Sequence, residues 1–493
     1  MKFRYVLGIW LVLATGGLPE AASGEAEYFA VFMEGKKVGC SIRNRVVSEG
    51  KVTSTEEIKI TLSRFGVPIS INAVETSVET ADGAPLGFEA VQGFGLMATK
   101  MNGTVSSQGT VNITTTTMGV EQKGKFEWPE GAVMAEGLRL LELKQGLREG
   151  TNYRVRVFSA MMLQAIDTEV RIGAKRNVDL LGRVVPLTEV TTVTRMPGAG
   201  EIVSTGYVDD ELRLQKDITP LIGLEIEMVA CAREFALGEN DVLEFIDKMI
   251  LPAPAPLGDV RSAKSVSYHL SPTSQKGSFT IPSSDSQSVW LLDGGKVVVT
   301  VEPVVMPRGA GFPYRGRDKE ILAATEATRY LQSDSKEIIE LAERAVGGTQ
   351  DAGEAVKRIE LFVKEYISEK DISIGYASAA EVAASRAGDC SEHAVLTAAM
   401  CRAAGIPAKV VCGLVYVEEI GGRRSVFVGH SWVEAYIGGK WVGLDATGAA
   451  DGYGPGHIAL ATGNGNPEDF FSLVGSLGRF KIDEMVVIIE RSR

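Results

Sequence analysis

The side chains best suited to covalent chemistry lie in the stretch RAGDCSEHAVLTAAMCRAAGIPAKVVCG, which begins at Arg386. Cys390 follows Gly-Asp and opens a run of small and apolar residues that predicts a helix ending at Gly405. Asp389 can cap this helix, and Glu392 stands where a capping box needs an acid. A thiol in the first helical turn faces unpaired N–H groups and the positive end of the helix dipole, which favour the thiolate. Cys390 is therefore a candidate nucleophile, although a cysteine with a packing role would fit the same pattern.

A second group of polar residues lies in the stretch FVGHSWVEAYIGGKWVGLDATG. Two apolar runs flank Gly438-Gly439, which predicts a two-residue hairpin turn. If Ile437 faces Lys440, alternation puts His430 and Asp445 on one face as diagonal neighbours about 7 Å apart. A carboxylate beside an imidazole is the pair of base and orienting group that a nucleophile needs. A buried hydrogen bond between the two, without a catalytic role, is the alternative.

A metal site is a further alternative, and its ligands would be Cys390, His393, His430 and Asp445. The sequence has no C-x-x-C pair and no H-x-x-x-H motif to support it, so we expect neither a metal nor another cofactor. His269 and His457 have no companions in the sequence and are interpreted as ordinary polar residues.

The two stretches together resemble the transglutaminase-like superfamily of papain-like folds, over about residues 350–465. Three blocks occur in the order of that family, with RAAGIPA and SWVE between them. The resemblance implies a Cys–His–Asp triad at Cys390, His430 and Asp445, with the nucleophile on a helix that packs on an antiparallel sheet. Ala446 stands where the family often has proline, and this change affects the turn and not the triad.

The same resemblance implies hydrolysis, transamidation or deamidation of an amide, although some members of the family have lost activity. No acidic calcium-binding loop stands out, so calcium-activated cross-linking is not expected. We therefore expect an exported cysteine-dependent amide-bond enzyme (a peptidase, amidase or transamidase) that acts through a thioester. The alternative is a non-enzymatic envelope-binding or scaffold protein with an inactive transglutaminase-like fold.

The organisation of the chain predicts an α+β protein. Alternating β-branched residues and turn breaks predict an antiparallel β-rich domain over 24–250. Two similar stretches, from Val78 and from Val208, leave open an internal duplication there. The Pro-rich LPAPAPLGD predicts a linker, followed by a small β segment, over 251–315. Helices that start at capping residues predominate over 316–493, which is the expected papain-like catalytic domain.

The N-terminus and the net charge limit the location and the partners. Lys2 and Arg4 precede a short apolar run and then small residues, which predicts a signal peptide over 1–23 and a mature start near Gly24. An uncleaved anchor is the alternative. The formal net charge of −12 argues against binding to nucleic acid or to anionic membranes. We expect a secreted or periplasmic protein that acts on a protein or peptide, such as a cell-envelope peptide, without stable membrane insertion.

Cysteine usage adds one constraint on the candidate nucleophile. The five cysteines are an odd number, so at least one thiol of an exported chain is left outside intramolecular bridges. Cys390 and Cys401 share the predicted helix, where eleven residues separate them by about 16 Å. No disulfide spans that distance, so Cys390 is not expected to be bridged to its neighbour on the helix.

Overall fold

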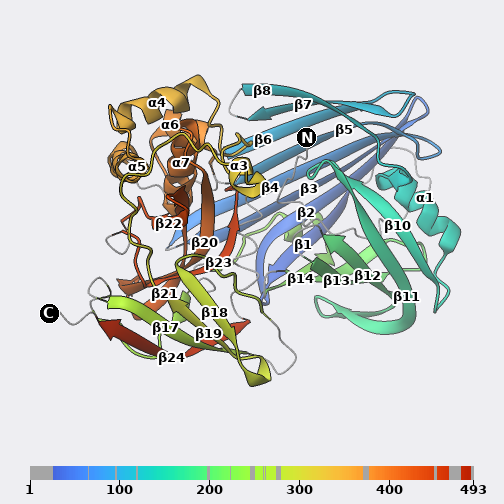
Figure 1. Cartoon of the computed structure of the whole chain (residues 1–493). Helices are drawn as coiled ribbons and strands as arrows, with labels where there is room; N and C mark the ends of the chain where they lie inside the picture. The colour runs from blue at the N-terminus through green and yellow to red at the C-terminus, as the bar shows by residue number, and fades with distance from the viewer. Residues whose placement is uncertain are drawn as a thin grey trace. The chain divides into compact units, whose positions relative to one another are not determined.

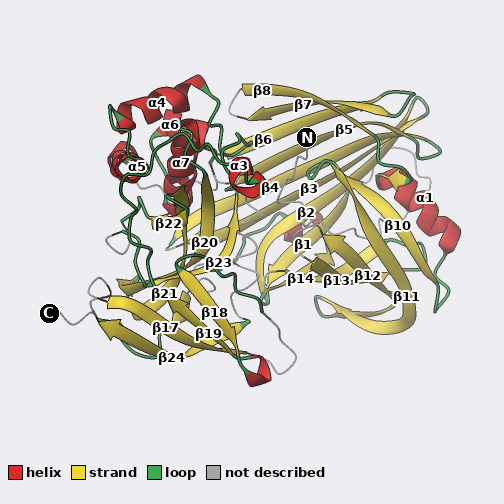
Figure 2. Cartoon of the chain, viewed as in Figure 1, coloured by secondary structure: helices red, strands yellow, loops and turns green. Residues whose placement is uncertain are grey.

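The computed structural model describes residues 26–64, 66–94, 97–117, 120–196, 200–221, 224–244, 250–258, 260, 263–273, 279–369, 377–448, 452–465 and 479–489. The predicted signal peptide, residues 1–23, lies outside these ranges. Within the described part of the chain, no helix is both long and apolar enough to cross a membrane. Most of the described elements are strands (Figure 2).

The chain forms two compact units, Met1–Glu244 and Phe245–Arg493. The described elements of the first unit are two helices and a long series of strands (Figure 1). The helices are α1 Ala135–Gln145 and α2 Arg233–Ala236. The strands are β1 Glu27–Met33, β2 Lys36–Ser48, β3 Lys51–Arg64, β4 Val67–Thr80, β5 Pro85–Phe94, β6 Met97–Val105, β7 Thr110–Thr117, β8 Val120–Glu127, β9 Ala132–Val133, β10 Asn152–Ser159, β11 Gln164–Leu180, β12 Arg183–Met196, β13 Gly200–Val208, β14 Leu214–Leu221 and β15 Leu224–Ala230.

These strands form one sheet in the order β8-β7-β6-β5-β4-β3-β2-β1-β15-β14-β13-β12-β11-β10-β9. Only β9 and β10 are parallel among the described pairs of this sheet. Two meanders, β1–β8 and β10–β15, are joined where β1 pairs with β15. The two similar stretches from Val78 and Val208 lie at the hairpins β4–β5 and β13–β14.

The sheet of the first unit curls so that strands far apart in its order share one core. The ring centroid of Phe88 on β5 lies 5.0 Å from that of Phe158 on β10. Trp128 lies 4.5 Å from the same Phe158 ring, and Met101 and Met161 are buried in this cluster. Because aromatic side chains bury a large apolar area, this cluster stabilises the curl.

The second unit contains the remaining helices and strands that the structure describes. The helices are α3 Lys319–Ala323, α4 Lys336–Val346, α5 Ala352–Tyr366, α6 Ala379–Ser385 and α7 Cys390–Ala403, with a short 3₁₀ helix, Asp293–Gly295. The strands are β16 Ile250–Pro252, β17 Ala263–Pro272, β18 Gln287–Leu291, β19 Val297–Val301, β20 Ala408–Ile420, β21 Arg423–Ile437, β22 Lys440–Leu444, β23 His457–Gly463 and β24 Phe480–Ile489.

Two sheets organise this unit. One has the order β16-β21-β20-β23, with β22 also paired to β21, and the other has the order β18-β19-β17-β24. The residues assigned above to a linker and a small β segment, 251–315, belong to this unit. Their first residues pair with β21, and β17 pairs with β24 near the end of the chain. This segment is thus hydrogen-bonded into the second unit on both sides of the Pro-rich stretch.

Four helices of this unit start at capping residues, as expected for this part of the chain. Asp318, Ser335 and Asp351 cap α3, α4 and α5 through their side chains, and Ser378 forms a capping box at α6. The first of these helices, α3, is short. It ends at Ala323, and the next carbonyl, that of Ala324, accepts from the N–H of Ala408 at 3.0 Å.

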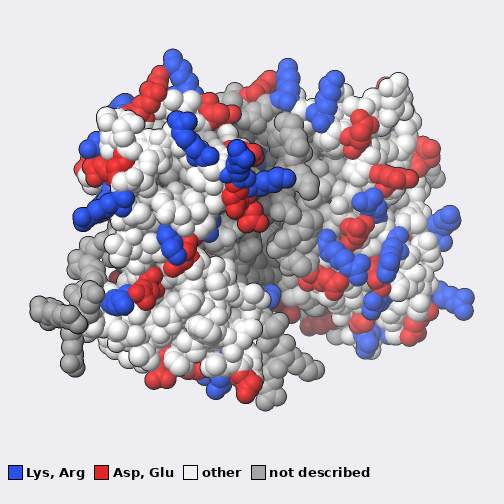
Figure 3. Space-filling view, viewed as in Figure 1, with Lys and Arg blue, Asp and Glu red and all other residues white. Residues whose placement is uncertain are grey.

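Helix α7 lies between the other helices and the first sheet. It contacts α4, α5 and α6 on one side and β20 and β21 on the other. Every residue from Ser391 to Arg402 is buried, which explains the run of small and apolar residues in the sequence. On the face of the molecule shown in Figure 3, basic and acidic side chains are interspersed. The net charge of −12 therefore does not gather into one acidic patch on that face.

Candidate active site

The start of α7 is built as the sequence predicts. The Asp389 carboxylate accepts from the N–H of Ser391 at 3.0 Å, and Glu392 Oε2 accepts from the N–H of Asp389 at 2.9 Å. Glu392 is fully buried and also accepts from the N–H of Ala377 at 2.9 Å. These bonds hold the loop that carries Cys390 into the helix, and Cys390 itself is half-buried.

Gly388 gives the backbone the conformation that it needs just before α7 begins. Its φ is +151°, a conformation that L residues rarely adopt. A Cβ atom at Gly388 would lie 2.3 Å from the Cβ of Glu392. No larger residue fits there unless the capping box moves, so the Gly-Asp-Cys sequence is explained by backbone geometry.

The hairpin that carries His430 has the predicted register. Gly438 and Gly439 have φ of +57° and +89°, and both signs are those of a type I′ turn. Ile437 pairs with Lys440, which confirms the register expected from the turn. The ladder ends one residue before Asp445, so this aspartate follows β22 and is not paired within it.

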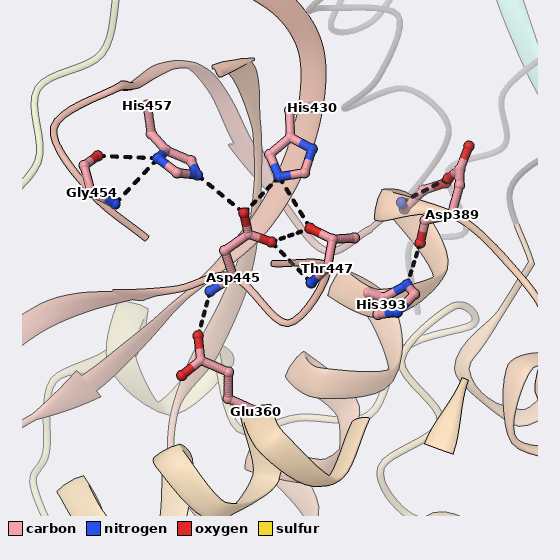
Figure 4. A network of polar contacts seen from close by, with 9 residues as sticks. Glu360, Asp389, His393, His430, Asp445, Thr447, Gly454 and His457 are labelled. Atoms are coloured by element: carbon pink, nitrogen blue, oxygen red, sulfur yellow. Dashed lines mark hydrogen bonds and ion pairs between the residues drawn. The ribbon is translucent and has the colours of Figure 1, made fainter. Parts of the chain in front are cut away.

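The side chains of His430 and Asp445 meet directly. His430 Nε2 lies 2.9 Å from Asp445 Oδ2, and both side chains are buried (Figure 4). The other carboxylate oxygen, Oδ1, accepts from the N–H of Thr447 at 3.1 Å and from the Thr447 hydroxyl. The Thr447 hydroxyl also lies 3.3 Å from His430 Nε2. Asp445 is therefore fixed by donors on both oxygens.

Cys390, at the start of α7, lies close enough to His430 to raise the pKa of its imidazole. Since Nε2 faces Asp445 and Thr447, Nδ1 is the nitrogen left for the thiol. Figure 4 shows this second nitrogen turned away from Asp445. Of the three residues selected from the sequence, His430 and Asp445 are thus in direct contact, and Cys390 acts on the pKa of His430.

The charges of this group support one another. Burial works against a charge on His430, but the Asp445 carboxylate and hydrogen bonds to Asp445 and Cys390 raise the pKa of His430 to about 10. Burial also opposes the charge of Asp445, yet the His430 charge holds the pKa of Asp445 well below its usual range. At neutral pH the pair is therefore an imidazolium and a carboxylate.

Sequence reasoning missed two residues that contact Asp445, and it assigned a third wrongly. Glu360 on α5 accepts from the N–H of Asp445 at 2.7 Å, and burial raises the pKa of Glu360. Thr447 is the second missed residue, and the Asp-x-Thr spacing from Asp445 to Thr447 is a local signal for a turn. His457, interpreted as a residue without companions, lies with Nε2 3.2 Å from Asp445 Oδ2. His457 begins β23, whereas Asp445 follows β22, so no local pattern indicates this contact.

The described residues also contain one group that is close enough to hold a metal ion. One ligand atom each of His430, Asp445 and His457 lies within 4.8 Å of the others. Their nitrogen–oxygen distances of 2.9 and 3.2 Å are those of direct hydrogen bonds. His393 takes no part in this group, and its Nδ1 lies 2.6 Å from the carbonyl of Asp389. The metal set proposed above as an alternative is therefore not brought together.

The part of the chain that carries these residues matches a known family. Residues 339–446 match the Transglutaminase-like superfamily, which confirms the resemblance drawn from the sequence. The matched segment begins in α4 and includes Cys390, His430 and Asp445, while His457 lies beyond it. The C-terminal unit thus contains a transglutaminase-like domain. No curated protein matches the chain.

Three solved structures show similarity over larger parts of the chain. A candidate cysteine protease from Cytophaga hutchinsonii is 20% identical, covers 47% of this chain and 93% of its own, and has a TM-score of 0.33. A β-barrel-like protein of a domain of unknown function from Brucella abortus is 11% identical, with 42% and 95% covered and a TM-score of 0.32. A candidate protease from Parabacteroides distasonis is 12% identical, with 75% and 68% covered and a TM-score of 0.20.

Proposed function

We propose that this chain is an exported cysteine-dependent enzyme that cleaves or exchanges amide bonds, with Cys390 as nucleophile, His430 as acid and base, and Asp445 as orienting group. The observation that supports it most is the environment of the His430 ring. One nitrogen lies 2.9 Å from Asp445, and Cys390 lies close enough to raise the pKa of the same ring. We also propose that α7 and the sheet of β20 and β21 form a papain-like core.

In the proposed first step, the Cys390 thiolate attacks the carbonyl carbon of an amide and forms a carbon–sulfur bond. The N–H of Cys390, in the first turn of α7, is placed to donate to the oxyanion that develops. The protonated His430 then gives its proton to the leaving amine as the carbon–nitrogen bond breaks. A thioester and a neutral His430 result, and Asp445 keeps the ring oriented throughout.

In the proposed second step, water or an amine attacks the thioester. His430 takes the proton of this nucleophile, the carbon–sulfur bond breaks, and the thiolate returns. Water gives a carboxylic acid and makes the enzyme a peptidase or amidase, whereas an amine gives a new amide and makes it a transamidase. A protein or peptide substrate, such as a peptide of the cell envelope, fits an exported location. Sequencing of the mature N-terminus tests that location and should begin near Gly24.

The experiment that tests the chemistry uses two cysteines of the same helix. Intact protein is treated with iodoacetamide, and the modified residue is found by mass spectrometry. Cys390 should react fast, whereas Cys401 should not, because burial raises the pKa of Cys401 to about 12. Wild type, Cys390→Ala and Cys401→Ala are then compared on a peptide library with and without added amine. Product masses separate hydrolysis from transamidation, and equal activity of Cys390→Ala and wild type would reject the proposal.

A further inference from the structure

His457 is held firmly beside the proposed triad. It is the first residue of β23 and pairs with Val415 on β20. Only 1% of its surface is exposed. Its ring lies 5.1 Å from that of Trp432, edge to face, and 4.9 Å from that of Tyr453. These packed aromatic neighbours restrict the imidazole to one orientation, with Nε2 directed at Asp445 (Figure 4).

The hydrogen bonds of His457 determine which nitrogen carries its proton. The carboxylate of Asp445 can only accept, so Nε2 of His457 must donate to Oδ2 across 3.2 Å. Nδ1 lies 3.2 Å from the N–H of Gly454 and 3.1 Å from the carbonyl oxygen of the same residue. In a neutral ring with its hydrogen on Nε2, Nδ1 accepts from the N–H. Burial lowers the pKa of His457, and the charge on His430 adds to this effect against the pull of Asp445. A neutral ring with its hydrogen on Nε2 satisfies the contacts with Asp445 and with the N–H of Gly454.

We propose that His457 is a positioning residue, which donates its Nε2 hydrogen to Asp445 Oδ2 and holds that oxygen in place for His430. The inference rests on the proposed function, because the position of Asp445 matters only if His430 acts on Cys390. Two imidazoles share Oδ2, and they have different roles. His430 carries the positive charge and faces the nucleophile, whereas His457 is a neutral donor on the far side of the carboxylate.

Loss of this donor has a chemical consequence. Without it, Oδ2 of a buried carboxylate keeps one imidazole donor, and the carboxylate gains freedom to turn about its broad terminal torsion. The charge on His430 is then less well stabilised, and His430 supports the proposed reaction of Cys390 less well. Outer partners of metal-bound histidines lower activity by about 10- to 100-fold when removed, and we expect a loss of that size.

The test compares two substitutions with different hydrogen-bonding ability. His457→Phe keeps a ring but removes the donor, whereas His457→Gln supplies an N–H₂ group near the position of Nε2. His269→Gln, on β17 in the other sheet of the unit, is the matched control. The rate of Cys390 alkylation by iodoacetamide is measured on the full-length chain between about pH 5 and pH 9. We expect His457→Phe to be about tenfold or more slower near neutral pH, and His457→Gln and His269→Gln to resemble wild type.

Nuclear magnetic resonance of wild type tests the same proposal without any variant. The chain has four histidines, so single substitutions assign their ring signals. The nitrogen shifts should show His457 neutral with hydrogen on Nε2 at neutral pH. A hydrogen on Nδ1 instead, or binding of Zn²⁺ that depends on His457, would overturn the proposal, because a nitrogen bound to metal cannot donate.

The kinetic outcomes separate this inference from the proposed function. If wild-type Cys390 reacts no faster than the same cysteine in urea-unfolded protein, the proposed function fails. If wild type reacts fast and a folded His457→Phe reacts equally fast, only the role of His457 fails. If His457→Phe and His457→Gln slow the alkylation of Cys390 equally, that role is also rejected, because the site would then need the imidazole ring itself and not its N–H donor. Circular dichroism and urea unfolding show whether each variant is folded.

Discussion

At the scale of single residues, the site depends on how one buried carboxylate is surrounded. Asp445 has two imidazoles on Oδ2, a threonine on Oδ1, and a glutamate that accepts from its backbone N–H. Each donor satisfies an acceptor that would be costly to bury alone. The arrangement keeps His430 charged and oriented. An experiment on the site should therefore remove the charge of Asp445.

Asp445→Asn should keep the fold and lose most of the turnover. The amide fills nearly the same volume, but it cannot hold the imidazolium of His430 or fix its tautomer. By analogy with a serine protease, we expect turnover to fall by about 10⁴-fold on a peptide substrate. His393→Ala is the comparison, since His393 is equally buried on α7 but contacts the carbonyl of Asp389. A greater loss from His393→Ala than from Asp445→Asn would contradict the proposed roles.

The charge of His430 should make stability depend on pH. Its pKa is about 10 in the folded chain, against an ordinary value of 6.5, so the folded state binds this proton more tightly. The contribution of His430 to the free energy of unfolding is therefore fully present below pH 6.5 and is lost as pH rises through about 10. Urea unfolding of wild type and His430→Gln should show a stability difference that shrinks over this interval. A difference that stays constant would mean that His430 is not charged at neutral pH.

At the scale of elements, two local structures present the proposed reacting groups. The type I′ turn sets the register of β21 and β22, and a slip of one residue would send His430 to the other face. The capping box fixes the start of α7 and with it the position of Cys390. Both depend on few residues, so each can be disturbed without altering the sheet or the helix beyond it.

Glu392→Ala should weaken the start of α7 strongly. Glu392 accepts from the N–H groups of Asp389 and Ala377, and its removal leaves these donors without that partner in a buried place. We expect a loss of about 1–3 kcal/mol in the free energy of unfolding for each donor, together with slower alkylation of Cys390. Glu337→Ala is the control, because Glu337 is exposed in the first turn of α4 and should change stability by less than about 0.5 kcal/mol. Similar losses in the two variants would argue against the capping role.

At the scale of the whole molecule, the chain has two units, each with its own buried core. Segments far apart in sequence close each unit: β1 pairs with β15 in the first, and β17 pairs with β24 in the second. The proposed site lies entirely in the second unit.

Limited proteolysis should divide the chain between the two units. Few contacts cross a boundary of this kind, so the first cut is expected between Glu244 and Ala263, before the pairing of β17 begins. The products should be a β-rich fragment and a fragment that contains the transglutaminase-like domain. Mass spectrometry of the fragments identifies the cut. A first cut within residues 380–445 would contradict this division.

The sequence by itself determined the features that depend on neighbouring residues. The turn at Gly438-Gly439, the register of its strands and the caps of α4 to α7 all follow from local backbone preferences, and the structure has them. Cys390 and the residues of the hairpin were selected in the same way. Only the tertiary structure decided that Glu360 and His457 contact Asp445, and that residues 263–272 pair with 480–489. These contacts join segments that are distant or separated by an irregular loop, and no periodicity or capping signal encodes a partner across such a distance. They form because buried polar groups and sheet edges must find hydrogen-bonding partners once the chain is compact.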